Sequence, residues 1–202
     1  MNYLAHLFLS PRSTQAVVGN LMGDFRKHVT AITLPEEVLR GIENHCRVDR
    51  FTDNHAVIGG LKHVFSGKRR RFAGIILDVA FDHFLSRHWD LFHTEQRVDY
   101  IDYLYGCLHG GRALMPPRMQ HAVDYMIAED WLGSYADLAG IDTCLNRMSK
   151  RIRFDNNLYG AIEEIQANYP ELDSGFLEFF PQLIDYINLH SHLCDHDTNN
   201  SF

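Results

Sequence analysis

The sequence predicts an all-α protein, with one compact helical domain over residues 1–190 and a polar tail over residues 191–202 that we expect to be frayed. Most segments carry apolar residues at steps of three and four, which is the spacing of a buried helix face. No segment shows the strict alternation of a half-buried strand, and no internal repeat or low-complexity linker divides the chain. At 202 residues the chain is long enough to build one sizeable core.

Composition narrows the class of protein. A hydrophobic content of 46% and a net charge of -7 are typical of a soluble globular protein without a general attraction to nucleic acid. No apolar run approaches the roughly 20 residues of a membrane helix, so we expect no membrane partner. The four cysteines are scattered, and the opening residues do not resemble a signal peptide. We therefore expect a cytoplasmic location.

Three helical segments are expected in the first 55 residues. Residues 2–9 provide one or two turns, residues 14–25 form the next helix, and residues 35–55 form a longer one that starts at a proline. Gly19 and Gly23 lie inside the second segment, although glycine costs roughly 0.5–1 kcal/mol in a helix interior relative to alanine. Close approach of another backbone or of a ligand would explain both glycines; a plain packing notch is the alternative.

The helix expected over residues 75–89 is apolar on nearly every side, which predicts a buried position. Asp78 and Asp82 stand four residues apart and therefore share one face of this helix. Burying two unpaired carboxylates is costly. A cation between them would remove that cost, so this helix predicts a metal site.

The second half of the chain shows aromatic and aliphatic stripes at helical spacing, without clusters of ligand-type residues. These stripes predict core-forming helices over residues 98–111, 116–131, 135–151, 155–169 and 170–187.

Polar pairs at four-residue spacing recur in each apolar segment before residue 90. The pairs are Asn2 and His6, Asn20 and Asp24, His45 and Asp49, and Asp78 and Asp82. Each pair alone could be a structural contact, but helices that pack together can bring such pairs to one place. The predicted metal ligands are Asp24, Asp78, Asp82, His6 and His45. A ligand set of imidazole and carboxylate suits Mn²⁺ best, with Mg²⁺ or Fe²⁺ possible. The chain has no Glu-x-x-His repeat, so the sequence does not indicate a di-iron centre.

Together these segments resemble the bacterial acyl carrier protein phosphodiesterases. The motifs that carry the resemblance are Asn2-x-Leu4-Ala5-His6-Leu7, Gly19-Asn20-Leu21-x-x-Asp24-Phe25, His45-x-Arg47-x-Asp49-x-x-Thr52-Asp53 and Asp78-x-x-x-Asp82-His83-Phe84-Leu85-x-Arg87-His88-Trp89. The resemblance implies a divergent HD-domain-like metal phosphohydrolase, although the adjacent pair Asp82 and His83 stands in the order opposite to that of standard HD proteins. It implies manganese-dependent cleavage of the phosphodiester between 4′-phosphopantetheine and a serine of holo-acyl carrier protein, within lipid metabolism and fatty acid biosynthesis.

A mechanism of metal-assisted phosphodiester hydrolysis gives the remaining candidate residues their expected roles. Asp24 would hold a metal that activates water, and His6 or His83 would protonate the serine oxygen that leaves. Arg47 or Arg87 would bind the phosphate. Acyl carrier proteins are acidic, so the basic run is the expected docking surface, and it comprises Lys68, Arg69, Arg70 and Arg71.

Two other functions fit the same residues. An HD-like phosphohydrolase acting on a nucleotide would use the same aspartates without needing a carrier protein. A helical binding module would use the polar pairs only to hold its helices together. The basic run would then be an ordinary solvated surface.

Overall fold

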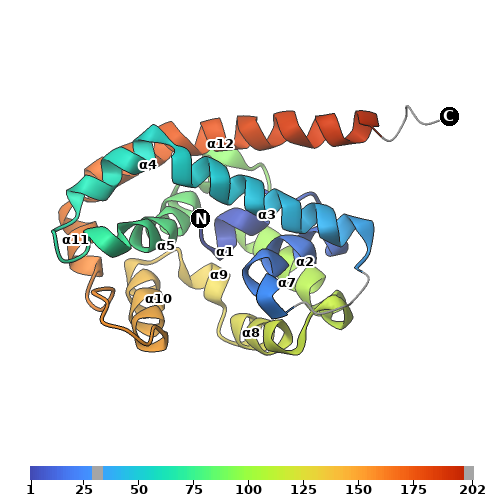
Figure 1. Cartoon of the computed structure of the whole chain (residues 1–202), viewed down its shortest axis with the longest axis horizontal. Coiled ribbons are helices and arrows are strands. Elements are labelled where there is room, and N and C mark those ends of the chain that lie inside the picture. The colour runs from blue at the N-terminus through green and yellow to red at the C-terminus, as the bar shows by residue number, and fades with distance from the viewer. Residues whose placement is uncertain (29–33, 198–202) are drawn as a thin grey trace.

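The structure is a computed structural model that describes residues 1–28 and 34–197, with side chains described up to residue 190. The described part is helical and contains no strand, which confirms the all-α prediction (Figure 1). The α-helices are α1 (Tyr3–Phe8), α2 (Thr14–Met22), α3 (Glu36–Asn54), α4 (Ala56–Leu61), α5 (Ala73–Arg87), α6 (Trp89–Phe92), α7 (Arg97–Gly110), α8 (Pro117–Ala128), α9 (Trp131–Ser134), α10 (Leu138–Arg151), α11 (Ile162–Ala167) and α12 (Tyr169–Asp197). Short 3-10 helices lie at Gly23–His28, Lys62–Val64, Arg70–Phe72 and Arg112–Leu114.

The long helices α3 and α12 form one side of the molecule. In Figure 1 they run along the top, and α12 packs on α3, α4 and α5. Helices α8, α9 and α10 lie on the opposite side, while α1 and α5 lie between the two groups. The N-terminal helix therefore lies inside the helical assembly.

Helix α5 is the centre of the core. Its side chains Ile76, Phe81 and Phe84 are fully buried, as the apolar pattern predicted. The ring of Phe81 packs edge-on against Phe176 and at a tilt against Phe179, both from α12. Burial of each such side chain contributes roughly 1.5–3 kcal/mol to the free energy of unfolding, so the packing of α5 on α12 stabilises the fold.

Glycines allow α2 and α3 to approach at backbone distance. A Cβ atom on Gly19 would lie 2.1 Å from the carbonyl oxygen of Val38, and one on Gly41 would lie 2.5 Å from that of Ala16. No side chain fits in such gaps. Close backbone approach is therefore the reason for the glycine inside α2.

Two predicted helices are interrupted in the structure. The helix expected over residues 155–169 is reduced to α11, because the Asn156 side chain donates to the carbonyl groups of Ser149 and Phe154 and so stabilises a loop. The helix expected over residues 116–131 stops at α8. Asp130 then adopts a left-handed conformation (φ 45°), and its carboxylate caps α9 by accepting from the Gly133 amide.

The domain boundary at residue 190 stays a prediction. Helix α12 ends at Asp197, and residues 198–202 of the expected tail lie outside the described residues. Across the described helices, none combines the length and the apolar character needed to cross a membrane.

Candidate metal centre

Asp82 fixes the N-terminal helix. Its two carboxylate oxygens each accept a backbone hydrogen bond of 2.9 Å, one from Leu4 and one from Ala5. The side chain is fully buried, and this burial raises the pKa of Asp82 to about 7 although both amides act to lower it. The two amides lie in the first turn of α1, where helical N–H groups have no partner within the helix. Asp82 therefore sets the position of α1 and of the histidine that α1 carries.

His6, His45 and Asp49 form the cluster that this helix placement creates. Their ligand atoms lie within 4.8 Å of one another. The carboxylate of Asp49 spans both rings, with Oδ1 3.1 Å from Nε2 of His6 and Oδ2 3.1 Å from Nε2 of His45. The two imidazoles stack with their centroids 3.9 Å apart. The three residues come from α1 and α3, which are far apart in the sequence.

The protonation states in this cluster suit a cation. Burial lowers the pKa of His6 to about 3, so its ring stays neutral and keeps a lone pair for a ligand bond. Burial alone would raise the pKa of Asp49, but its contacts with His45 and His6 outweigh that effect and lower the pKa. Asp49 is therefore a carboxylate at neutral pH.

Two further acids border the cluster. The Oδ1 atom of Asp24 lies 3.8 Å from Nε2 of His45. Asp78 lies on α5, and its Oδ1 is 3.1 Å from the amino group of Met1, which is also 3.6 Å from Oδ1 of Asp49. The side chains of Asp24, Asp49 and Asp78 are 34–46% exposed, whereas the two histidines are buried. Asp24 and Asp78 line a cavity, whereas the two imidazoles are buried in the protein interior.

Buried polar atoms without a hydrogen-bond partner include ring nitrogens of both clustered histidines. Within the described side chains they are Nδ1 of both His6 and His45, Nε2 of His6, both amide atoms of Asn20, and Nδ2 of Asn2. Buried polar groups are normally paired, so unpaired ring nitrogens on both clustered histidines fit a bound ion with its water. Gly23 is part of this arrangement, since a Cβ atom there would lie 2.2 Å from Cγ of His45. The donor set and the space are suited to a divalent cation.

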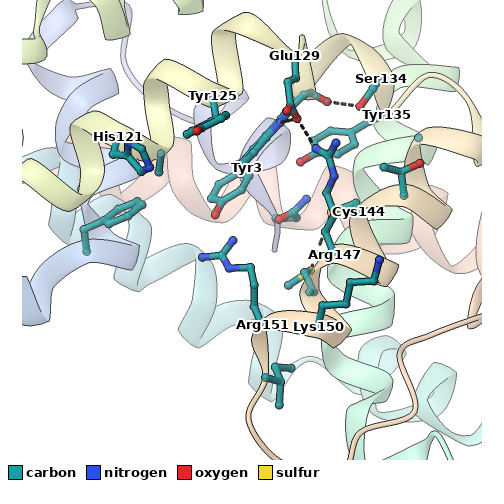
Figure 2. Close-up of a pocket in the computed structure, with 18 of the residues that line it drawn as sticks. Tyr3, His121, Tyr125, Glu129, Ser134, Tyr135, Cys144, Arg147, Lys150 and Arg151 are labelled. Carbon is teal, nitrogen blue, oxygen red and sulfur yellow. Dashed lines mark hydrogen bonds and ion pairs between the residues drawn. The ribbon is translucent and has the colours of Figure 1, made fainter.

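A cavity of about 300 Å³ opens on the acids, and Asp24, Asp78 and Met1 line it. It adjoins a larger cavity of about 920 Å³ between α1, α8 and α10, which is drawn in Figure 2. Both cavities include Tyr3, Arg118 and Arg151 in their walls. The two cavities therefore adjoin, and Asp24 and Asp78 line the smaller one.

The structure places His83 away from these cavities. Its Nδ1 is 3.1 Å from the carbonyl oxygen of Tyr135, and its Nε2 is 2.8 Å from the hydroxyl of Tyr169. Burial lowers the pKa of His83, so the neutral ring donates to the carbonyl and accepts from the hydroxyl. Both ring nitrogens are occupied, and His83 is not among the residues that line either cavity.

The two arginines expected to bind phosphate also lie elsewhere. Arg47 forms a 2.6 Å ion pair with Glu43 and donates to the carbonyl of His190. The guanidinium of Arg87 lies over the ring of Tyr169, with 5.6 Å between its carbon and the ring centroid. Neither arginine lines either cavity.

The residues of the basic run differ in the contacts that their side chains form within the protein. Arg69 pairs with Glu164 at 2.7 Å and also donates to the carbonyl groups of Asn157 and Tyr159. Lys68, Arg70 and Arg71 are exposed. The exposed members precede α5, which carries Asp78 and lines the 300 Å³ cavity.

Comparison with known proteins identifies the family. The sequence profile of the family described as "Acyl carrier protein phosphodiesterase" matches residues 1–183. The chain belongs to the acyl carrier protein phosphodiesterase family. It is 34% identical to the acyl carrier protein phosphodiesterase of Photorhabdus laumondii subsp. laumondii over 92% of this chain and 94% of the relative. It is 35% identical to the proteins of the same name from Serratia proteamaculans and Salmonella agona, over 91% of this chain and 96% of each relative.

These relatives place this member of the acyl carrier protein phosphodiesterase family among the hydrolases. No solved structure is significantly similar to the chain. The HD-like character of the fold accordingly stays a prediction.

Several residues of the candidate site were not predicted from the sequence. Asp49 was noted as the polar residue four positions after His45 but was not included among the metal ligands, although this spacing indicated that the two residues share a helix face. Tyr3, Arg118 and Arg151 carried no such signal, because their position at the cavities depends on how α1, α8 and α10 pack.

Proposed function

We propose that the protein is a metal-dependent phosphodiesterase that acts on holo-acyl carrier protein. It hydrolyses the phosphodiester between 4′-phosphopantetheine and serine, giving apo-acyl carrier protein and free 4′-phosphopantetheine. The observation that carries this proposal is the cluster of His6, His45 and Asp49 beside a cavity lined by Asp24 and Asp78. The names of the family and of its relatives supply the substrate. Such a carrier belongs to cytoplasmic fatty acid biosynthesis.

The metal would be held by His6, His45 and Asp49, with Asp24 and Asp78 close enough to complete its surroundings. Two imidazoles with several carboxylates favour Mn²⁺, while Mg²⁺ and Fe²⁺ share much of this preference. Such an ion lowers the pKa of bound water and offsets the negative charge of the phosphate.

The chain's own residues prepare the site for this chemistry. Asp82 holds α1 in place through the amides of Leu4 and Ala5, and thereby keeps His6 against His45. Arg151, in the wall of both cavities, provides a guanidinium for the phosphate oxygens next to the acids. It takes the role expected of Arg47 and Arg87, whose side chains lie elsewhere.

The exposed Lys68, Arg70 and Arg71 are the proposed docking surface for the acidic carrier. They lie just before α5, so a carrier bound there would be near the end of the helix that carries Asp78. Arg69 supports this surface from within, since its guanidinium ties the segment to Glu164.

The test is incubation of the purified protein with holo-acyl carrier protein and Mn²⁺, followed by intact mass measurement of the carrier. We expect the mass of the carrier to fall by that of the phosphopantetheine group. Both a chelator and the Asp49→Asn variant should prevent this loss. Asp102→Asn, which changes an exposed acid on α7, serves as the matched control and should retain turnover. Turnover that persists under chelation and in Asp49→Asn would contradict the metal-dependent mechanism.

A further inference from the structure

The two cavities adjoin and share part of their walls. The residues common to both walls are Asn2, Tyr3, Phe25, Arg118, Met148 and Arg151. Asp24 and Asp78 line the 300 Å³ part, and the 920 Å³ part lies on the other side of the shared walls, between α8 and α10. Ligand pockets for small molecules commonly measure about 300–1,000 Å³. The larger part is therefore of a size to hold an extended organic group that starts at the acids.

The junction between the two parts is cationic. Arg118 and Arg151 both line it, and Figure 2 shows Arg151 reaching into the hollow towards Tyr3. Burial raises the pKa of Tyr3 to about 12, so its hydroxyl stays protonated and can donate a hydrogen bond. Guanidinium and hydroxyl donors beside the candidate metal site match a phosphate group.

The larger part has a different chemistry from the junction. Its walls include the aromatic side chains of Tyr3, Tyr125 and Trp131, and Tyr3 stacks on Trp131 with 6.2 Å between the ring centroids. Among the described residues that line it, Glu129 is the one acid, and Arg147 neutralises it in an ion pair. The aromatic and apolar parts of these walls suit an uncharged chain with methyl and amide groups.

We infer that the 920 Å³ cavity binds the pantetheine arm of the substrate, with Arg151 and Arg118 holding its phosphate at the junction. This inference rests on the proposed function for the identity of the substrate. The arm has the matching sequence of groups: a phosphate at one end, then a dimethyl segment and two amides. The cavity would thus select the prosthetic group, while the basic surface before α5 binds the carrier protein.

Direct binding tests this inference without turnover. Titration calorimetry of the metal-free protein with 4′-phosphopantetheine should show binding to the wild type. Ala122 lines the cavity from α8, so Ala122→Trp should fill the space and weaken binding by more than about tenfold. Ala128→Trp, at the exposed end of the same helix, is the matched control and should bind as the wild type does.

Binding of ligands with and without the phosphate tests the role of the junction. Arg151→Gln should weaken binding of 4′-phosphopantetheine by about tenfold, and it should change binding of pantetheine, which lacks the phosphate, far less. Arg153→Gln changes an exposed arginine that lines neither cavity and should alter neither affinity. Equal weakening of both ligands in Arg151→Gln would overturn the assignment of the phosphate position.

Hydrolysis separates this inference from the proposed function. With holo-carrier, Ala122→Trp should lose more kcat/KM than it loses with bis(p-nitrophenyl) phosphate, a diester without the arm. If the wild type binds 4′-phosphopantetheine but leaves holo-carrier intact, the proposed function fails and the binding site stands. If the wild type cleaves holo-carrier and Ala122→Trp binds and cleaves equally well, the cavity assignment is wrong.

Discussion

At the scale of single residues, the two acids of α5 have different tasks. The carboxylate of Asp82 is occupied by two backbone amides, whereas that of Asp78 reaches the cavity. The same face of one helix thus holds a structural acid and an acid available to a cation. Asp49, from another helix, completes the cluster with the two histidines.

Loss of Asp82 should therefore destabilise the protein itself. In Asp82→Ala two buried amides lose their acceptor, and a penalty of about 2–4 kcal/mol in the free energy of unfolding is expected. Urea denaturation followed by circular dichroism measures it. Asp102→Ala removes an exposed carboxyl group and should stay within about 0.5 kcal/mol of the wild type. A stable Asp82→Ala protein that merely loses metal would show that Asp82 is a ligand instead.

The raised pKa of Asp82 also predicts a pH dependence in the metal-free protein. A carboxyl group with a raised folded-state pKa favours folding when protonated, so its ionisation lowers stability as pH rises from the ordinary value near 4 to about 7. An upper bound of about 4 kcal/mol follows from this shift of roughly three units. Asp82→Asn cannot ionise, so the wild type should lose stability relative to this variant across that range. A stability difference that does not change with pH would contradict the assignment.

At the scale of elements, the contact between α2 and α3 positions the cluster. Gly19 and Gly41 bring the two backbones together, and Gly23 leaves room for the ring of His45. Because His45 and Asp49 both lie on α3, any separation of these helices would move two of the three clustered residues.

Substitution of Gly19 by alanine should break this contact. The added methyl group would meet the Val38 carbonyl at 2.1 Å, and the expected loss is about 3 kcal/mol in the free energy of unfolding. Gly59→Ala on α4 is the control, since in the described structure nothing beyond its chain neighbours and its own helix backbone lies within 4 Å of the added group. That variant should gain about 0.5–1 kcal/mol from helix propensity. Thermal or urea unfolding of both variants measures these opposite changes in stability. A Gly19→Ala protein as stable as the wild type would contradict the close packing.

At the scale of the whole molecule, net charge opposes the proposed partnership. The chain carries a net charge of -7, and its proposed partner is acidic too. Attraction must then be local, and the exposed Lys68, Arg70 and Arg71 before α5 are its proposed source. Electrostatic steering of this kind weakens within a screening length of about 10 Å at 0.1 M salt.

Removal of this basic surface should raise KM for the carrier. The combined substitution Lys68→Gln, Arg70→Gln and Arg71→Gln is expected to raise KM about fivefold at low salt and to have little effect at about 1 M salt. Steady-state kinetics with holo-carrier at several salt concentrations measures the change. Arg50→Gln removes an exposed positive charge from α3 and should leave KM near the wild-type value. Equal KM values for the triple variant and the wild type at low salt would exclude this docking surface.

The sequence by itself determined the helical class, the buried central helix and the residues from which a metal site could be built. These features depend on local periodicity: apolar residues at steps of three and four define a helix face, and polar pairs at steps of four lie together on it. His6 and His45 were recognisable for this reason. The interruptions at Asp130 and Asn156 were not, because side-chain hydrogen bonds to the local backbone decide them.

Only the tertiary structure decided what each polar residue does. Asp82 became the anchor of α1 and Asp49 joined the histidines because of how α1, α3 and α5 are rotated against one another. The cavity that Arg151 shares with Tyr3 likewise forms between helices more than a hundred residues apart in the chain. Spacing along one helix fixes which side chains share a face, but the partner of that face is set by long-range packing.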